Sequence, residues 1–152
     1  MRFRPPRLHC AVLLCAALVA GCGGGDDKAA KPKQATPEDI VRAWSVALNS
    51  GEDKKAAALF ADGAKISQAG VEYTLINGAG RYEFNSGLPC SGQIVELHST
   101  GVAEVTATFV LGQRANHRCD APGVKTTAVF TIRGGRIVAF RQLPAPEPGP
   151  AA

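Results

Sequence analysis

The sequence predicts a domain of the α+β class, with helices at its N-terminal end and a mostly antiparallel sheet after them. One observation is that apolar residues recur every three or four positions between residues 36 and 60, which is the period of an amphipathic helix. A second is that apolar and polar residues alternate from residue 64 onward, which is the period of a strand. A third is the order of these segments. Helices followed by a run of strands are typical of α+β rather than α/β domains.

The first helix is predicted to begin at Thr36. A threonine can cap a helix, Pro37 suits the first helical position, and Glu38 and Asp39 complement the positive end of the helix dipole. One apolar stripe follows, made of Ile40, Val41, Trp44, Ala47 and Leu48. The Asn-Ser-Gly sequence at 49–51 is expected to end this helix.

A second, shorter helix is predicted from Glu52 to Phe60. Ala56, Leu59 and Phe60 would face the core, and the Asp-Gly pair at 62–63 would close the helix.

Strands are predicted over residues 65–68, 71–76, 93–99, 102–111, 125–133 and 136–143. The Asn-Gly-Ala-Gly sequence at 77–80 is expected to interrupt the chain, with one helical turn at 81–85 and a turn cluster at 87–92. Gly134 and Gly135 join the last two strands and indicate a hairpin.

The N-terminal 21 residues have the features of a secretory signal peptide. Three arginines (Arg2, Arg4 and Arg7) precede an apolar run at 8–20 that is too short to remain as a membrane span, which needs about 20 residues. The run ends in Val-Ala-Gly-Cys at 19–22, which resembles the lipobox of bacterial lipoproteins. The resemblance implies that the thiol of Cys22 receives a diacylglyceryl group and that cleavage occurs just before it. The alternative is an ordinary signal peptide that happens to be followed by a cysteine.

The expected organisation is therefore a lipoprotein signal peptide (1–21), a lipidated cysteine with a flexible tether (22–35), one domain (36–144) and a proline-rich disordered tail (145–152). This organisation places the domain on the extracytoplasmic side of the cell membrane, held by the lipid anchor. Basic residues outnumber acidic ones by 17 to 13, but three of them leave with the signal peptide. The mature chain is then nearly neutral, which argues against nucleic acid as a partner.

Two cysteines remain within the domain, Cys90 and Cys119. Cys10 and Cys15 belong to the signal peptide, and Cys22 is assigned to the lipid. An even pair outside the cytoplasm indicates a disulfide. The alternatives are a metal site or a reactive thiol, but no histidine stands at a ligand spacing from Cys90, and no metal set or cofactor motif is found.

Several motifs, taken in order, resemble the NTF2-like (SnoaL-like) superfamily. They are the first helix with Ile40, Val41 and Trp44, the sequence Leu-Phe-Ala-Asp-Gly at 59–63, and the sequence Gly-Gly-Arg-Ile-Val-Ala-Phe-Arg at 134–141. The resemblance implies a cone in which a curved sheet wraps around a helix and encloses a pocket. The superfamily includes isomerases, cyclases, dehydratases and binding modules, so the fold does not determine the function.

Candidates for acid–base chemistry are few. Glu96 and His98 are two residues apart on a predicted strand, so they would share a face with Ile94. They form either an acid–base pair or a polar pair on the solvent side of the sheet. Glu72 is a further candidate base. Its neighbour Tyr73 would point to the opposite face and could not line the same pocket.

Four residues are candidates for ligand binding: Tyr73, Arg81, Tyr82 and Arg141. Arg81 and Tyr82 lie in a glycine-rich stretch near the expected rim of the pocket, and Arg141 lies near the end of the last strand.

Without a convergent acid–base set, the sequence favours a non-catalytic module of the cell envelope. Its partner would be a small hydrophobic ligand or an envelope protein, and a homodimer is compatible with the resemblance. One alternative is an enzyme of the ketosteroid-isomerase or polyketide-cyclase kind that uses a pocket carboxylate. The other is a structural accessory module of a cell-wall complex.

Overall fold

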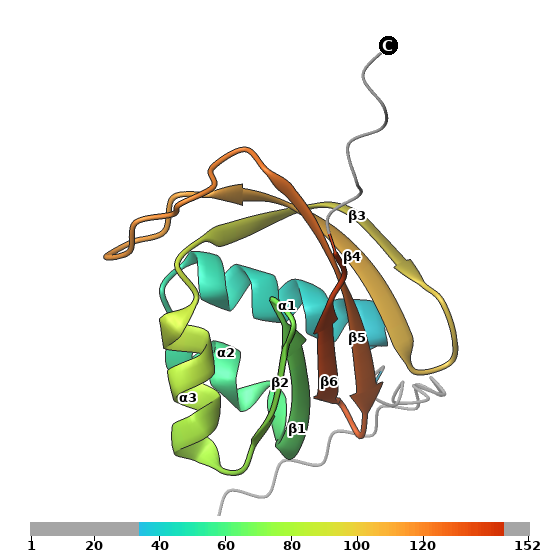
Figure 1. Ribbon diagram of the computed structural model, residues 1–152. Coiled ribbons are helices and arrows are strands. Elements are labelled where there is room, and N and C mark those ends of the chain that lie inside the picture. The colour runs from blue at the N-terminus through green and yellow to red at the C-terminus, as the bar shows by residue number, and fades with distance from the viewer. Residues whose placement is uncertain (1–33, 145–152) are drawn as a thin grey trace, which may run out of the picture. The chain divides into compact units, whose positions relative to one another are not determined.

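The structure has three helices and one six-stranded mixed sheet within residues 34–144, the part of the chain that the computed structural model describes (Figure 1). The helices are α1 (Pro37–Asn49), α2 (Asp53–Ala58) and α3 (Gly78–Gly87). The strands are β1 (Phe60–Gln68), β2 (Val71–Leu75), β3 (Ser91–Ser99), β4 (Glu104–Gly112), β5 (Lys125–Arg133) and β6 (Arg136–Gln142). The predicted signal peptide, Cys22, most of the tether and the tail lie outside the described residues.

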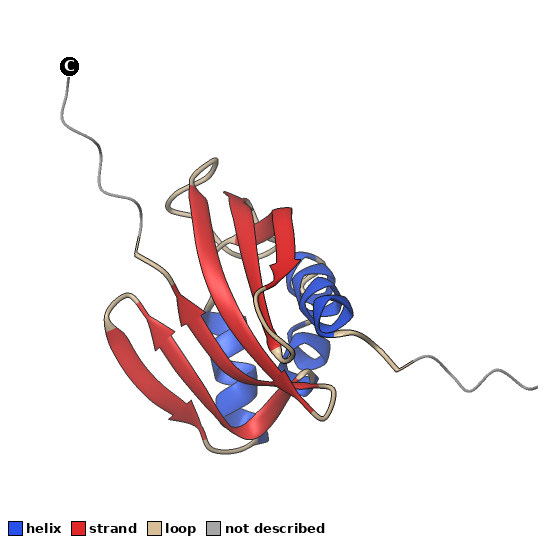
Figure 2. Ribbon diagram, turned by 90° about the vertical axis from the view of Figure 1, so that its right-hand side faces the viewer, coloured by secondary structure: helices blue, strands red, loops and turns tan. Residues whose placement is uncertain are grey.

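The sheet has the order β2-β1-β6-β5-β4-β3, and all neighbouring strands are antiparallel except β1 and β6. Helix α1 lies under the curved part of the sheet made by β3 and β4 (Figure 1). Helices α2 and α3 lie near one end of α1. The three helices gather on one face of the sheet (Figure 2). This arrangement confirms the predicted α+β cone. No helix within residues 34–144 combines the length and the hydropathy that crossing a membrane requires.

The start of α1 is as predicted. The hydroxyl of Thr36 accepts a hydrogen bond from the backbone N–H of Asp39 (3.2 Å), and the Asp39 carboxylate accepts one from the backbone N–H of Thr36 (2.9 Å). These two bonds form a capping box. The predicted apolar stripe from Ile40 to Leu48 is buried.

The second helix is shorter than predicted, because Phe60 belongs to β1. Phe60 is fully buried and pairs with Ile137 of β6. The prediction that Asp62 and Gly63 close a helix is therefore wrong. Both lie within β1, where the register with β6 shifts between Phe60 and Lys65 and Gly63 has a φ of +78°. Burial of Phe60 beneath the sheet outweighs the helical pattern of the residues before it.

Helix α3 replaces the predicted break and single turn. The side chain of Asn77 accepts a hydrogen bond from the backbone N–H of Gly80 (3.1 Å), so Asn77 caps the helix. The helix buries Phe84 and Asn85. The cap and this burial compensate for the poor helix propensity of Gly78 and Gly80.

The predicted facing of β3 is wrong beyond Ile94. A bulge lies between Ile94, which pairs with Phe109, and Glu96, which pairs with Thr108. The extra residue shifts the alternation. Ile94 and Leu97 therefore pack against the core, whereas Glu96 and His98 are exposed. The predicted strand at 102–111 begins only at Glu104.

The core is built around Trp44. Its indole ring contacts four phenylalanine rings with centroid distances of 5.3 to 6.3 Å: Phe60, Phe109, Phe130 and Phe140. The indole N–H donates to the side-chain oxygen of Asn85 (2.8 Å), which is fully buried, and the Asn85 amide donates to the Arg81 carbonyl (2.8 Å). The first bond holds α1 against α3, the second lies within α3, and together they satisfy the buried side-chain atoms of Trp44 and Asn85.

Candidate functional site

A cavity of about 150 Å³ lies between α1 and the inner face of the sheet. Its lining consists of Trp44, Ser45 and Leu48 of α1, residues 88–92 at the start of β3, Phe109 and Leu111 of β4, Thr126 and Ala128 of β5, Phe140 and Gln142 of β6, and Gln68 of β1. No side chain in this lining is ionisable, because Cys90 is held in a disulfide. The cavity is therefore apolar and uncharged, with a few neutral polar groups.

Most polar groups of the lining are already hydrogen-bonded within the protein. The Ser45 hydroxyl donates to the Gly92 carbonyl (2.8 Å), and the Ser91 hydroxyl donates to the Gln113 carbonyl (2.9 Å). The Gln142 amide nitrogen donates to the Thr126 hydroxyl (3.0 Å). These bonds leave few polar atoms of the cavity wall available to a ligand.

One wall of the cavity, residues 88–92, is held by the segment that connects β4 to β5. The Cys90–Cys119 disulfide joins the two segments, which confirms the predicted pair. The hydrogen bond from Ser91 to Gln113 adds a second connection. A third comes from Arg114, whose Nη1 donates to the Leu88 carbonyl (2.6 Å).

Arg114 is a buried cation that sequence reasoning missed. Its side chain donates to the carbonyls of Leu48 (3.1 Å) and Asn85 (3.0 Å) at the ends of α1 and α3, and it forms an ion pair with Asp53 of α2. Only 4% of the residue is exposed. Burial lowers the pKa of the Arg114 guanidinium from its ordinary value. The side chain thus ties three helices to the cavity wall.

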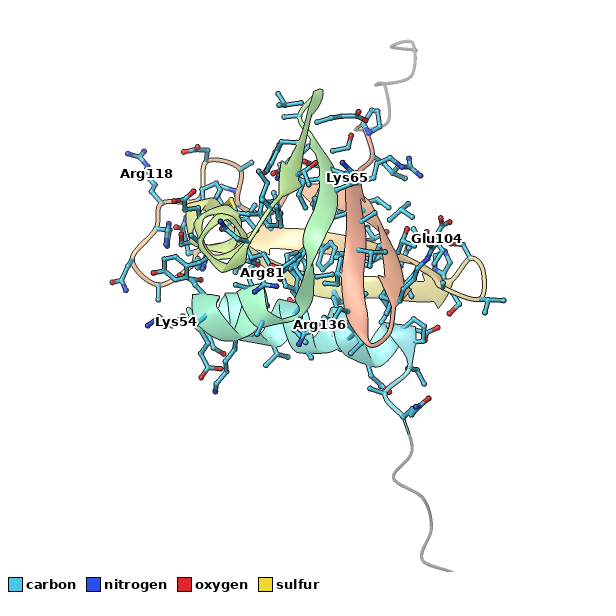
Figure 3. All side chains as sticks on the ribbon, turned by 90° about the horizontal axis from the view of Figure 1, so that it is seen from below. Lys54, Lys65, Arg81, Glu104, Arg118 and Arg136 are labelled. Atoms are coloured by element: carbon cyan, nitrogen blue, oxygen red, sulfur yellow. A yellow bond between two sulfur atoms is a disulfide. The ribbon has the colours of Figure 1, made fainter. Side chains whose placement is uncertain are left out.

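A second concavity, of about 540 Å³, lies on the sheet and brings together three of the residues singled out from the sequence: Glu72, Tyr73 and Arg141. The prediction that Tyr73 could not line the same pocket as Glu72 is therefore wrong, because both border this concavity. Lys65 and Glu104, both labelled in Figure 3, also line it. Arg141 follows the buried Phe140, so its side chain points to the face away from the interior cavity. Burial raises the pKa of the Tyr73 hydroxyl. None of these five residues lines the interior cavity.

The other predicted candidates lie apart from the interior cavity. Glu96 is exposed and accepts a hydrogen bond from the Thr108 hydroxyl (3.2 Å), and His98 is exposed on the same strand. Arg81, labelled in Figure 3, and Tyr82 line a shallow cleft beside α2. Arg81 also forms an ion pair with Asp62 of β1 (2.9 Å). Among residues 34–144, no group of three or more potential ligands could hold a metal ion.

No protein-family model and no curated protein matches this chain. Solved structures do match over most of the domain. An NTF2-like protein of unknown function from Cytophaga hutchinsonii is 11% identical, with a TM-score of 0.61 over 74% of this chain and 93% of that chain. A putative polyketide cyclase from Sinorhizobium meliloti is 20% identical, with a TM-score of 0.56 over 69% and 94%.

A third similar structure contains a small ligand. It is a hypothetical protein with a ketosteroid isomerase-like fold from Catenulispora acidiphila, in complex with trimethylamine. It is 21% identical, with a TM-score of 0.57 over 72% of this chain and 87% of that chain. At these identities the similarity establishes the fold alone.

Proposed function

From the NTF2-like fold and an interior cavity without ionisable lining, we propose that this domain is a non-catalytic module that binds a small apolar molecule. In this proposal a lipid on Cys22 holds the domain at the extracytoplasmic surface of the cell membrane. The main support for a binding role is the chemistry of the cavity wall. Aromatic and aliphatic side chains dominate this wall, and none of the described residues that line it is an acid or a base.

The same observation weighs against catalysis in the cavity. Removing a proton next to a carbonyl requires a base within hydrogen-bond reach of that proton. Glu72, Glu96 and His98 do not line the interior cavity. An apolar cavity of about this volume can hold a single benzene ring. The trimethylamine complex of a similarly folded protein is an instance of this fold with a small organic ligand.

Binding can be tested with toluene on the full chain. Trp44 is the only tryptophan of the sequence, so its indole N–H gives a single NMR resonance that reports on the cavity. Toluene is expected to shift this resonance saturably. Ala128→Leu, which adds volume inside the cavity, should abolish the shift. Ala139→Leu is the matched control, because Ala139 lines the outer concavity and not the interior one. A saturable shift that survives Ala128→Leu would contradict binding at this site.

The same sample tests for catalysis. Deuterium incorporation next to the carbonyl of cyclohexanone is expected to proceed no faster than in buffer. Acceleration that Glu72→Gln or Glu96→Gln removes would favour the isomerase or cyclase alternative instead.

The lipid anchor rests on the sequence and has its own test. In a bacterial host that is fed a fatty acid with a clickable tag, the wild-type chain is expected to acquire the tag and partition into the detergent phase. Cys22→Ala should abolish both, whereas Cys15→Ala, inside the predicted signal peptide, should leave both unchanged. Labelling that persists in Cys22→Ala would refute this assignment.

A further inference from the structure

We propose that the cavity selects a neutral, single-ring molecule with one O–H or N–H donor, and that the side-chain oxygen of Gln142 accepts this donor. This inference rests on the proposed function and names the chemical class of its ligand. It follows from the size of the cavity, from its charge and from the hydrogen bonds that its wall leaves unmade.

Size limits the ligand to about one ring. The volume of about 150 Å³ is below the roughly 300 to 1,000 Å³ of pockets that hold drug-sized ligands. A cavity of this volume lined by apolar side chains accepts benzene. The rings of Trp44, Phe109 and Phe140 form part of the wall, so they can pack on the faces and edges of an aromatic ligand.

Charge excludes an ion. The cavity wall holds no cation or anion among the described residues, so a buried carboxylate or ammonium would lose its hydration without gaining a partner. The ligand is therefore neutral.

The unused hydrogen-bonding atoms fix the polar end of the ligand. Trp44 donates to Asn85, and the hydroxyls of Ser45 and Ser91 donate to backbone carbonyls. The amide nitrogen of Gln142 donates to the hydroxyl of Thr126, which leaves the amide oxygen of Gln142 as an acceptor. The Thr126 hydroxyl and the Gln68 amide remain as donors in the same wall, so a ligand hydroxyl, which both donates and accepts, fits this set of atoms. A ligand with a donor would satisfy the Gln142 acceptor, and a purely apolar ligand would leave it unpaired.

A second amide lies beside it. Ser67 pairs with Arg141 in the parallel register of β1 and β6, so Gln68 and Gln142 are the next residues on neighbouring strands. Both line the cavity, both are half-buried, and the side chain of Gln68 has no hydrogen-bond partner among residues 34–144. The two amides thus form a polar edge of the cavity wall. This edge orients the ring inward and the donor towards Gln142.

Phenol and toluene separate this inference from the proposed function, because they have similar shapes and differ in the donor. Phenol is expected to bind the full chain roughly three- to tenfold more tightly than toluene, as one neutral hydrogen bond would provide. The readout is the indole N–H resonance of Trp44. In Gln142→Leu, phenol affinity should fall to that of toluene, while toluene affinity is retained. Gln93→Leu is the matched control, because Gln93 is exposed and outside the cavity wall.

Each other outcome is decisive. Equal affinities for phenol and toluene in the wild-type chain would overturn the inference and leave the proposed function standing. Binding of neither would overturn both. Tighter binding of benzoate or trimethylammonium than of phenol would overturn the neutral ligand class.

Discussion

Replacing Arg114 with methionine is expected to lower the free energy of unfolding by about 3 to 5 kcal/mol, the range seen when one partner of a buried ion pair is removed. The guanidinium donates hydrogen bonds to the carbonyls of Leu48, Asn85 and Leu88 and forms an ion pair with the carboxylate of Asp53. A methionine fills a similar volume but donates nothing, so the Leu88 carbonyl and the partly buried Asp53 carboxylate would lose this donor. The carbonyls of Leu48 and Asn85 would keep only their backbone donors. Urea denaturation followed by circular dichroism measures the loss.

Arg118→Met is the matched control. Arg118 lies in the same connecting segment, is exposed and has no side-chain hydrogen bond or ion pair among the described residues, so its replacement should change stability by less than about 0.5 kcal/mol. Arg114→Lys tests the geometry rather than the charge. A lysine keeps the positive charge but lacks the planar fork that reaches several acceptors, so it should restore only part of the stability. Equal stability of Arg114→Met and the wild type would contradict the assigned role.

Removing the disulfide is expected to cost about 3.5 kcal/mol, the value that the chain-entropy model gives for a loop of this length. The bond joins residues 29 positions apart in the sequence. The double variant Cys90→Ala/Cys119→Ala avoids a free thiol and should unfold at a lower urea concentration than the wild type.

Reduction provides the internal control. A dithiol reductant should lower the stability of the wild-type chain to that of the double variant and leave the double variant unchanged. A reductant effect of the same size on both proteins would show that the loss does not come from this bond.

Local patterns predicted those parts of the fold that local forces determine. The cap at Thr36, the apolar stripe of α1 and the Gly-Gly hairpin are each encoded within a few neighbouring residues. The errors arose where distant contacts decide the structure. Phe60 follows a helical pattern but belongs to β1, because it pairs with Ile137 of β6 and its side chain packs in the core. The bulge in β3 is set by pairing with β4, which the alternation of β3 alone does not reveal.

The site was less accessible to sequence reasoning for the same reason. Charged and aromatic residues drew attention to Glu96, Arg81 and Tyr82, which lie outside the cavity wall. Gln142 and Gln68 are ordinary strand residues by sequence, and only the parallel pairing of β1 with β6 brings them together. Arg114 lies in a connecting segment, and its sequence predicts exposure to solvent. The only signal there was its position near Cys119, whose disulfide draws this segment towards the domain.

The pairing of β1 with β6 also determines when the chain can fold. The first strand lies between β2 and the last strand, so its partner on one side is synthesised only at the C-terminal end of the domain. An emerging chain that lacks β6 has neither this partner nor Phe140, which contacts Trp44 in the core. Contacts between such distant segments form late and slowly. The complete sheet and core can therefore form only when synthesis of the domain is nearly finished.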